Sequence, residues 1–251
     1  MSTAKRYTYV DFRQEPVTGC FAKTTHAIAA STNTLQWYTR VGSEGHYFEF
    51  LNIDTNTKIF PVADASGWLL PDVDTDAIGG AISQGIVAGA ATKMKFVTGT
   101  DAFYLKCKLL VTDIDNFDII AIGFRELAAY AVTTTPALLK TDYDHKALIG
   151  VFDDAGAVVT EVSTAAGADV ETACTGTPIV TGTAFTWEVR IRKDLSVEFY
   201  VNGVLDALAA AATPVVTTGK TLIPHIVHIN TGTGTLGTIH LQTYECGLLE
   251  S

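Results

Sequence analysis

The strongest constraint on the fold is a strict alternation of apolar and polar residues over positions 187–192. Trp187, Val189 and Ile191 fall on one side of an extended chain, and the residues between and after them are Glu or Arg. A period of two is typical of a strand with one buried face. The pattern returns over 197–201, and Asn202-Gly203 follows, a dipeptide that favours a type I′ hairpin turn. This stretch therefore predicts a three-strand meander.

Other segments repeat these signals. Residues 103–111 alternate in the same way, and residues 117–125 are almost continuously apolar, which predicts a strand buried on both faces. Further strands are expected at 147–152, 158–162, 221–230 and 236–244. Together they predict an all-β fold, a two-sheet antiparallel β-sandwich over roughly residues 91–251. The side chains expected to face inward are those of Leu105, Leu109, Trp187, Val189, Ile191, Phe199 and Val201.

The first ninety residues are less regular. Residues 35–41 and 46–53 suggest a hairpin, and residues 1–34, rich in Thr, Ala and Ser, suggest an extended N-terminal arm. The glycines of segment 77–91 favour an irregular loop. We therefore expect three parts: an arm over 1–34, a hairpin and irregular lead-in over 35–90, and the sandwich over 91–251. The only helical composition, at 207–212, is brief and ends before Pro214, which predicts a turn of helix or a loop.

Charge and cysteine usage exclude several classes of protein. The formal net charge of -10 argues against a nucleic acid partner, because phosphate binding requires clustered Lys and Arg. No apolar run approaches the ~20 residues that cross a bilayer, so no membrane partner is expected. The first residues lack the apolar segment of a secretory signal, which predicts synthesis in a cytoplasm. Four widely spaced cysteines, expected to be buried free thiols, are Cys20, Cys107, Cys174 and Cys246.

Acidic residues suggest one calcium site. Asp72, Asp74 and Asp76 alternate as oxygen ligands of calcium do. An EF-hand would need Gly at the sixth position and Glu at the twelfth, where this chain has Ala77 and Ser83. A solvated acidic loop is the favoured interpretation, and Asp113 with Asp115 is similarly interpreted as a turn.

Histidines suggest zinc or acid–base chemistry, but neither pattern is complete. His225 and His228 are three residues apart on a predicted strand, with His240 further along, so the first two point to opposite faces. Asp142 and His145 form a possible acid and base pair without an identifiable nucleophile. The Glu-x-Asp-x-x-Glu pattern of sandwich-fold glucanases is absent. The sequence thus predicts no catalytic residue, no metal ligand and no cofactor, and we expect a protein that is not an enzyme.

Two surface features have alternative interpretations. The cations of the predicted strands could form a basic stripe, but ordinary solvation or cross-strand pairing with Glu188 and Glu198 is favoured. These cations are Lys106, Lys108, Arg190 and Arg192. Tyr104 and Tyr200 are expected to be exposed, as a sugar platform or simply as packing residues.

The segment from Thr186 to Gly203, with its early Trp and its final Asn-Gly turn, resembles the paired strands of concanavalin A-like jelly-roll sandwiches of the laminin-G and lectin type. The resemblance extends from about Lys95 to the C-terminus. It implies the fold but no ligand, because this fold has many functions.

A narrower resemblance, to head decoration or cement proteins of tailed bacteriophages, rests on four segments: 96–104, Gly123-Phe-Arg125, Leu222-Ile-Pro-His and Glu245-Cys-Gly-Leu-Leu249. It implies a virion structural protein on the capsid exterior, made in the host cytoplasm. The implied partners are the major capsid protein and further copies of the chain, with a trimer favoured. The alternative is a carbohydrate-binding or receptor-binding fibre domain, whose partner would be a glycan.

Overall fold

The computed structural model describes residues 4–11, 13, 20–24, 36–41, 46–52, 62–69, 78–83, 94–113, 118–127, 143–152, 157–165, 169–175, 179–230 and 238–250. These residues are almost entirely β, and their strands form two antiparallel sheets. Among the helical residues described, none belongs to a segment with the length and apolarity of a membrane span.

Eight described strands form the first sheet, ordered β16-β15-β14-β9-β18-β6-β5, with β1 also paired to β18. Their bounds are β16 (Val204–Leu205), β15 (Val197–Val201), β14 (Ala184–Ile191), β9 (Phe103–Asp113), β18 (Thr238–Leu249), β6 (Gly67–Leu69), β5 (Val62–Asp64) and β1 (Ala4–Asp11).

Ten described strands form the second sheet, ordered β13-β12-β11-β10-β17-β7-β4-β3-β2, with β8 also paired to β17. Their bounds are β13 (Asp169–Ala173), β12 (Val158–Ser163), β11 (Lys146–Val151), β10 (Asp118–Glu126), β17 (Thr221–Asn230), β7 (Ile78–Ser83), β4 (His46–Asn52), β3 (Gln36–Val41), β2 (Cys20–Thr24) and β8 (Phe96–Val97).

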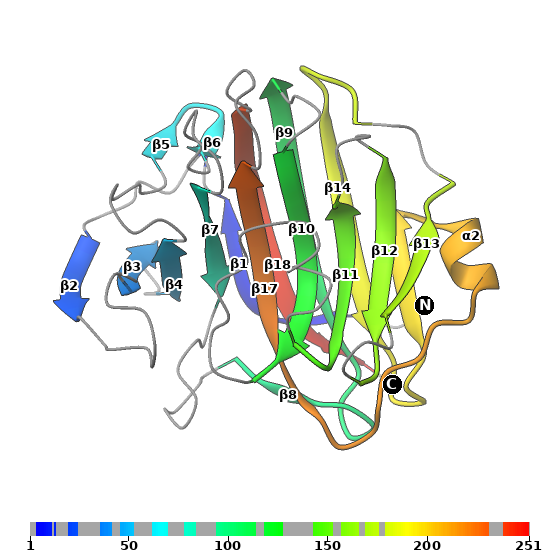
Figure 1. Ribbon diagram of the computed structural model, residues 1–251. Helices are drawn as coiled ribbons and strands as arrows, with labels where there is room; N and C mark the ends of the chain where they lie inside the picture. The colour runs from blue at the N-terminus through cyan, green and yellow to red at the C-terminus, as the bar shows by residue number, and fades with distance from the viewer. Residues whose placement is uncertain are drawn as a thin grey trace.

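The two sheets pack face to face around one apolar core, and the layers are visible in Figure 1. The sandwich predicted from the sequence is confirmed. The seven side chains expected to face inward all lie in the core cluster or pack against it. Trp187 has an exposed fraction of 1% and contacts Phe185 with ring centroids 4.8 Å apart. Strand β10 is buried from Ile119 to Arg125, as its continuous apolar sequence predicts.

The meander is confirmed as β14, β15 and β16. Asn202 and Gly203 have φ of 51° and 79°, the two positive values that a type I′ turn requires. The predicted helical turn is α2 (Ala207–Ala211), which follows β16. Asp206 caps it by accepting a hydrogen bond of 2.9 Å from the backbone N–H of Ala209.

The region before residue 91 differs from expectation in one respect. Segment 77–91 was predicted to be irregular, but it contains β7, which pairs with β17 on one side and β4 on the other. Glycine weakens the interior of a strand, but here both edges of β7 are hydrogen-bonded to neighbouring strands, which outweighs that cost. The hairpin predicted over 35–53 is confirmed as β3 and β4.

The described segments of the predicted N-terminal arm pair within the same chain. Strand β1 pairs with β18 and β2 pairs with β3, so each belongs to one of the two sheets. The sandwich thus includes strands on the N-terminal side of residue 91.

Candidate functional site

The outer face of the ten-stranded sheet, opposite the core, has two cross-strand rows of residues that include ionisable side chains. We call these rows rungs. Residues directly opposite one another on neighbouring strands share a face. The first rung consists of Arg125, Lys146, Ser163 and Asp169 on β10, β11, β12 and β13. The second consists of His225, Gly123, Leu148, Glu161 and Glu171 on β17, β10, β11, β12 and β13. Ionisable groups from five strands therefore share one face.

Four residues of this face and Tyr143, from the segment just before β11, form what we call the charged cluster: Arg125, Tyr143, Lys146, Glu161 and His225. The Lys146 ammonium lies 2.8 Å from Glu161 Oε1 and 3.7 Å from Asp169 Oδ1. The Arg125 guanidinium lies 4.4 Å from the centre of the Tyr143 ring, a cation–π contact. The rings of Tyr143 and His225 are 6.1 Å apart. The cluster contains both acids and bases within a short distance.

Burial determines what the charged cluster is able to do. The side chains of Lys146 and Glu161 have no exposed surface, and Arg125 is equally buried. Burial, followed by the nearby charges of Arg125 and Lys146, lowers the pKa of His225 well below its ordinary value, so the ring is neutral at pH 7. Because solvent does not reach these side chains, a dissolved ligand does not reach them either. We interpret the cluster as a structural network rather than a binding site.

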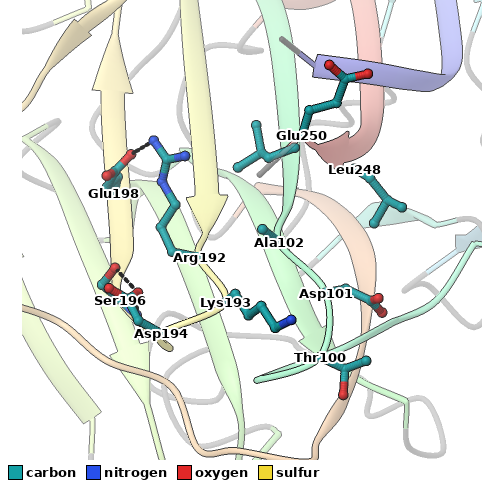
Figure 2. Close-up of a pocket in the computed structure, with 11 residues that line it drawn as sticks. Thr100, Asp101, Ala102, Arg192, Lys193, Asp194, Ser196, Glu198, Leu248 and Glu250 are labelled. Atoms are coloured by element: carbon teal, nitrogen blue, oxygen red, sulfur yellow. Dashed lines mark hydrogen bonds and ion pairs between the residues drawn. The ribbon is translucent and has the colours of Figure 1, made fainter. Parts of the chain in front are cut away.

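A different site is open to solvent. A hollow of about 1000 Å³ lies where the turn before β9, the β14–β15 turn and the end of β18 meet (Figure 2). Its residues are Thr100, Asp101, Ala102, Arg192, Lys193, Asp194, Ser196, Glu198, Leu248, Leu249 and Glu250. We call it the polar hollow. Its lining combines two leucines and an alanine with carboxylates, cations and hydroxyls.

Hydrogen bonds within turns and between strands hold the walls of the polar hollow in place. The Ser196 hydroxyl and backbone N–H donate to Asp194 Oδ1 at 2.6 and 3.1 Å and close the β14–β15 turn. The backbone N–H of Val97 donates to Asp101 Oδ2 at 2.9 Å and closes the turn before β9. The backbone N–H of Leu249 donates to the Ala102 carbonyl at 2.8 Å, which joins β18 to that turn. The site is therefore largely preformed.

Two carboxylates of the polar hollow, those of Asp194 and Glu198, are held in their charged form. Hydrogen bonds from Ser196 lower the pKa of Asp194. Partial burial opposes ionisation of Glu198, but hydrogen bonds from Arg192 and Tyr200 outweigh it and lower the pKa of that carboxyl. The Arg192 guanidinium donates to Glu198 Oε2 at 2.7 Å. At pH 7 this wall offers strong hydrogen-bond acceptors beside strong donors.

Next to the hollow, the outer face of the eight-stranded sheet carries a partly exposed ladder of charges. Arg190 pairs with Glu188 and lies 4.2 Å above the Tyr200 ring, while the Tyr200 hydroxyl donates to Glu198 at 2.9 Å. The expected cross-strand pairing is confirmed for Arg192, which pairs with Glu198 of β15, whereas Arg190 pairs with Glu188 of its own strand. Tyr104 was expected to be exposed but is buried, because its hydroxyl donates to Glu245 of β18 at 2.6 Å and holds the side chain against the sheet.

The predicted metal candidates do not converge in the described part of the chain. His228 pairs with Ile120 of the core face, whereas His225 lies on the outer face, as their spacing predicts. No group of three or more His, Cys, Asp or Glu side chains that could hold a metal occurs among the described residues. Asp72, Asp74, Asp76, Asp115 and Asp142 lie outside them.

Cys107 and Cys246 are buried free thiols as expected, and burial raises the pKa of half-buried Cys174 to about 12.

Sequence reasoning did not single out the residues of either site as a group. Lys146 and Glu161 follow the alternation of their strands, but their pairing depends on register. The Lys193-Asp194 turn was recognised as a turn, yet its proximity to Asp101 requires the tertiary fold.

Comparison with known proteins supports the fold. No protein-family model matches the sequence, and no curated protein does. The carbohydrate-recognition domain of Emp46p, in its potassium-bound form, aligns over 80% of this chain and 88% of that chain, with a TM-score of 0.57 and 8% identity. The alginate lyase AlyC3 aligns over 78% of this chain and 81% of that chain, with a TM-score of 0.50 and 9% identity. The chain therefore has the concanavalin A-like jelly-roll sandwich fold, and at these identities the likeness concerns the fold alone.

Proposed function

We propose that this chain is a carbohydrate-binding domain without catalytic activity and that the polar hollow is its glycan site. The observation that carries the proposal is the preformed, solvent-open hollow, whose lining combines apolar side chains with charged and hydroxyl side chains. Its volume lies at the upper end of the range of small-ligand sites. The Emp46p carbohydrate-recognition domain gives this reading a precedent on the same fold.

The charge of the hollow favours a neutral ligand. It contains four acidic side chains, Asp101, Asp194, Glu198 and Glu250, and two basic ones, Arg192 and Lys193. Carboxylates accept hydrogen bonds from sugar hydroxyls, and the cations donate to ring and hydroxyl oxygens. An anionic ligand would meet more acidic than basic groups. A neutral oligosaccharide, with an apolar face and hydroxyl edges, therefore fits this lining best.

Two of these carboxylates, those of Asp194 and Glu198, are poorly suited to glycoside cleavage. A glycosidase needs one carboxyl that is protonated at working pH so that it acts as a general acid. Asp194 and Glu198 have lowered pKa values, whereas a general acid needs a raised pKa. These groups are suited to binding rather than acid catalysis.

A glycan array followed by calorimetric titration of the best ligand tests this proposal. We expect binding of a neutral oligosaccharide, and we expect the exposed-group variants Lys193→Gln and Asp194→Asn to weaken it by roughly 10-fold each, the loss of one hydrogen bond to a charged group. Lys95→Gln, an exposed lysine outside the hollow, is the matched control and should bind normally. An array without ligands, or full affinity in both hollow variants, would rule the proposal out.

We propose a second function, a structural role on the exterior of a tailed-phage capsid, in which the chain contacts the major capsid protein and other copies of itself. Its net charge of -10 favours this location, because the inner capsid wall faces packed DNA. The resemblance to decoration proteins, with its favoured trimer, points the same way.

Electron microscopy of capsids incubated with the purified chain tests this second function. Added density on the outer surface, together with greater resistance of the capsids to heat, is the expected result. Capsids that bind no chain under conditions where the glycan array is positive would leave only the first proposal.

A further inference from the structure

Exposed apolar side chains gather on one stretch of the sandwich edge, residues 204–215, which we call the edge segment. Val204 is 70% exposed, Leu205 42%, Leu208 46% and Val215 52%. These are four of the six large apolar side chains that are exposed in the described part of the chain. Scattered surface leucines and valines are normal, but a contiguous group marks an interaction surface.

The edge segment contains β16, the terminal strand of the eight-stranded sheet, and lies beside β15. Its β16 pairs with Tyr200 and Val201 near the end of β15, and Val215 forms a bridge with Ser196 just before β15 begins. Helix α2 lies between these two contacts. Figure 1 shows α2 at the same side of the molecule as β13, the terminal strand of the other sheet. The surface therefore lies where the two sheets end together.

The exposed part of the edge segment carries no charge. Asp206 is its only ionisable residue, and its side chain is buried. The Asp206 carboxylate accepts hydrogen bonds from the Ala209 backbone N–H and from both the backbone N–H and hydroxyl of Thr175, at 2.7 to 2.9 Å. The exposed residues of the edge segment, all uncharged, are Val204, Leu205, Ala207, Leu208, Ala211, Ala212, Thr213 and Val215.

We infer that the edge segment is the contact surface of a two-fold symmetric homodimer of this chain. Two copies with a net charge of -10 each repel one another, and a contact made at an uncharged surface places no like charges face to face. An apolar patch is complementary to itself, which is what a two-fold contact requires. A membrane surface is a poorer partner, because helices that lie on membranes carry Lys or Arg beside the apolar face. This inference is independent of the first proposed function, and it differs from the trimer that the second one favours.

Analytical ultracentrifugation of the full chain, over a range of protein concentrations, tests the inference. We expect the wild-type chain to sediment as a dimer at micromolar concentrations. Leu208→Glu should weaken the dimer by roughly 100-fold or more, because the two-fold axis places two unpaired charges in the interface. Leu208→Met, which keeps an apolar side chain, should remain dimeric.

Thr183→Glu is the matched control, since it adds the same charge at an exposed position outside the edge segment. Near-ultraviolet circular dichroism, to which the buried Trp187 contributes, checks that each variant is folded. A wild-type monomer at all concentrations would overturn the inference. A trimer, or a dimer that persists in folded Leu208→Glu, would also overturn it and would assign the contact to another surface.

Discussion

The two outer sheet faces carry similar groups in different surroundings. On the ten-stranded sheet, Lys146 and Glu161 pair at 2.8 Å with no exposed side-chain surface. On the eight-stranded sheet, Arg192 and Glu198 pair at 2.7 Å, and each side chain is 28% exposed. The distances are nearly equal, so the two pairs differ mainly in their exposure to solvent. Water screens the charges of Arg192 and Glu198, and their face remains accessible to a ligand. The charges of Lys146 and Glu161 are not solvated by water, so neighbouring protein groups alone stabilise them.

The comparison shows why a concentration of acids and bases does not by itself identify a binding site. The charged cluster has the richer chemistry, yet its side chains are inaccessible. The polar hollow has ordinary surface residues, but they are reachable and held in place by their turns. Accessibility, more than the variety of ionisable groups, distinguishes the candidate site.

The largest effect is expected when the buried pair is broken. Glu161→Gln removes the anion from a fully buried Lys146, and such a change costs about 3 to 5 kcal/mol of unfolding free energy. Asp169, at 3.7 Å from the Lys146 ammonium, offsets part of this cost and favours the lower end of the range. Urea denaturation of the wild-type and variant chains measures the difference.

Replacing both members of the buried pair provides the control. Lys146→Met combined with Glu161→Leu leaves no unpaired charge and should be closer in stability to the wild-type chain than Glu161→Gln is. If Glu161→Gln cost less than about 1 kcal/mol, the pair would be solvated and the contrast between the faces would disappear.

An intermediate effect is expected from the neutral His225. Its folded-state pKa lies below the ordinary value of 6.5, so below pH 6.5 the unfolded chain binds a proton that the folded chain does not. His225 should therefore leave stability unchanged above pH 6.5 and lower it as the pH falls, by up to about 1.4 kcal/mol per pH unit. His225→Gln should make the loss of unfolding free energy with acid shallower. Parallel pH profiles for the two chains would refute this role.

The smallest effect is expected at the exposed pair. Glu198→Gln should change the unfolding free energy by less than about 1 kcal/mol, because both partners are partly solvated. High salt should reduce that difference further. A loss of unfolding free energy comparable to that of Glu161→Gln would show that solvent exposure does not distinguish the two pairs.

The sequence predicted the elements of the fold better than their contacts. Alternation at Trp187 and the Asn202-Gly203 turn are local signals, so the meander was predictable. Strand β7 was missed because its glycines are unfavourable locally and are supported only by pairing with two distant strands. The burial of Tyr104 depends on Glu245, which lies far along the chain. The charged cluster and the polar hollow both depend on such long-range register, and local patterns do not encode it.

The most direct test of the functional account is to locate a bound glycan by amide chemical-shift perturbation in nuclear magnetic resonance spectra. With the best ligand from the array, the account predicts the largest shifts at Asp101, Asp194 and Ser196 around the polar hollow. Shifts should be absent at Lys146 and Glu161 in the charged cluster. Shifts concentrated on that buried face, with none around the hollow, would contradict the account.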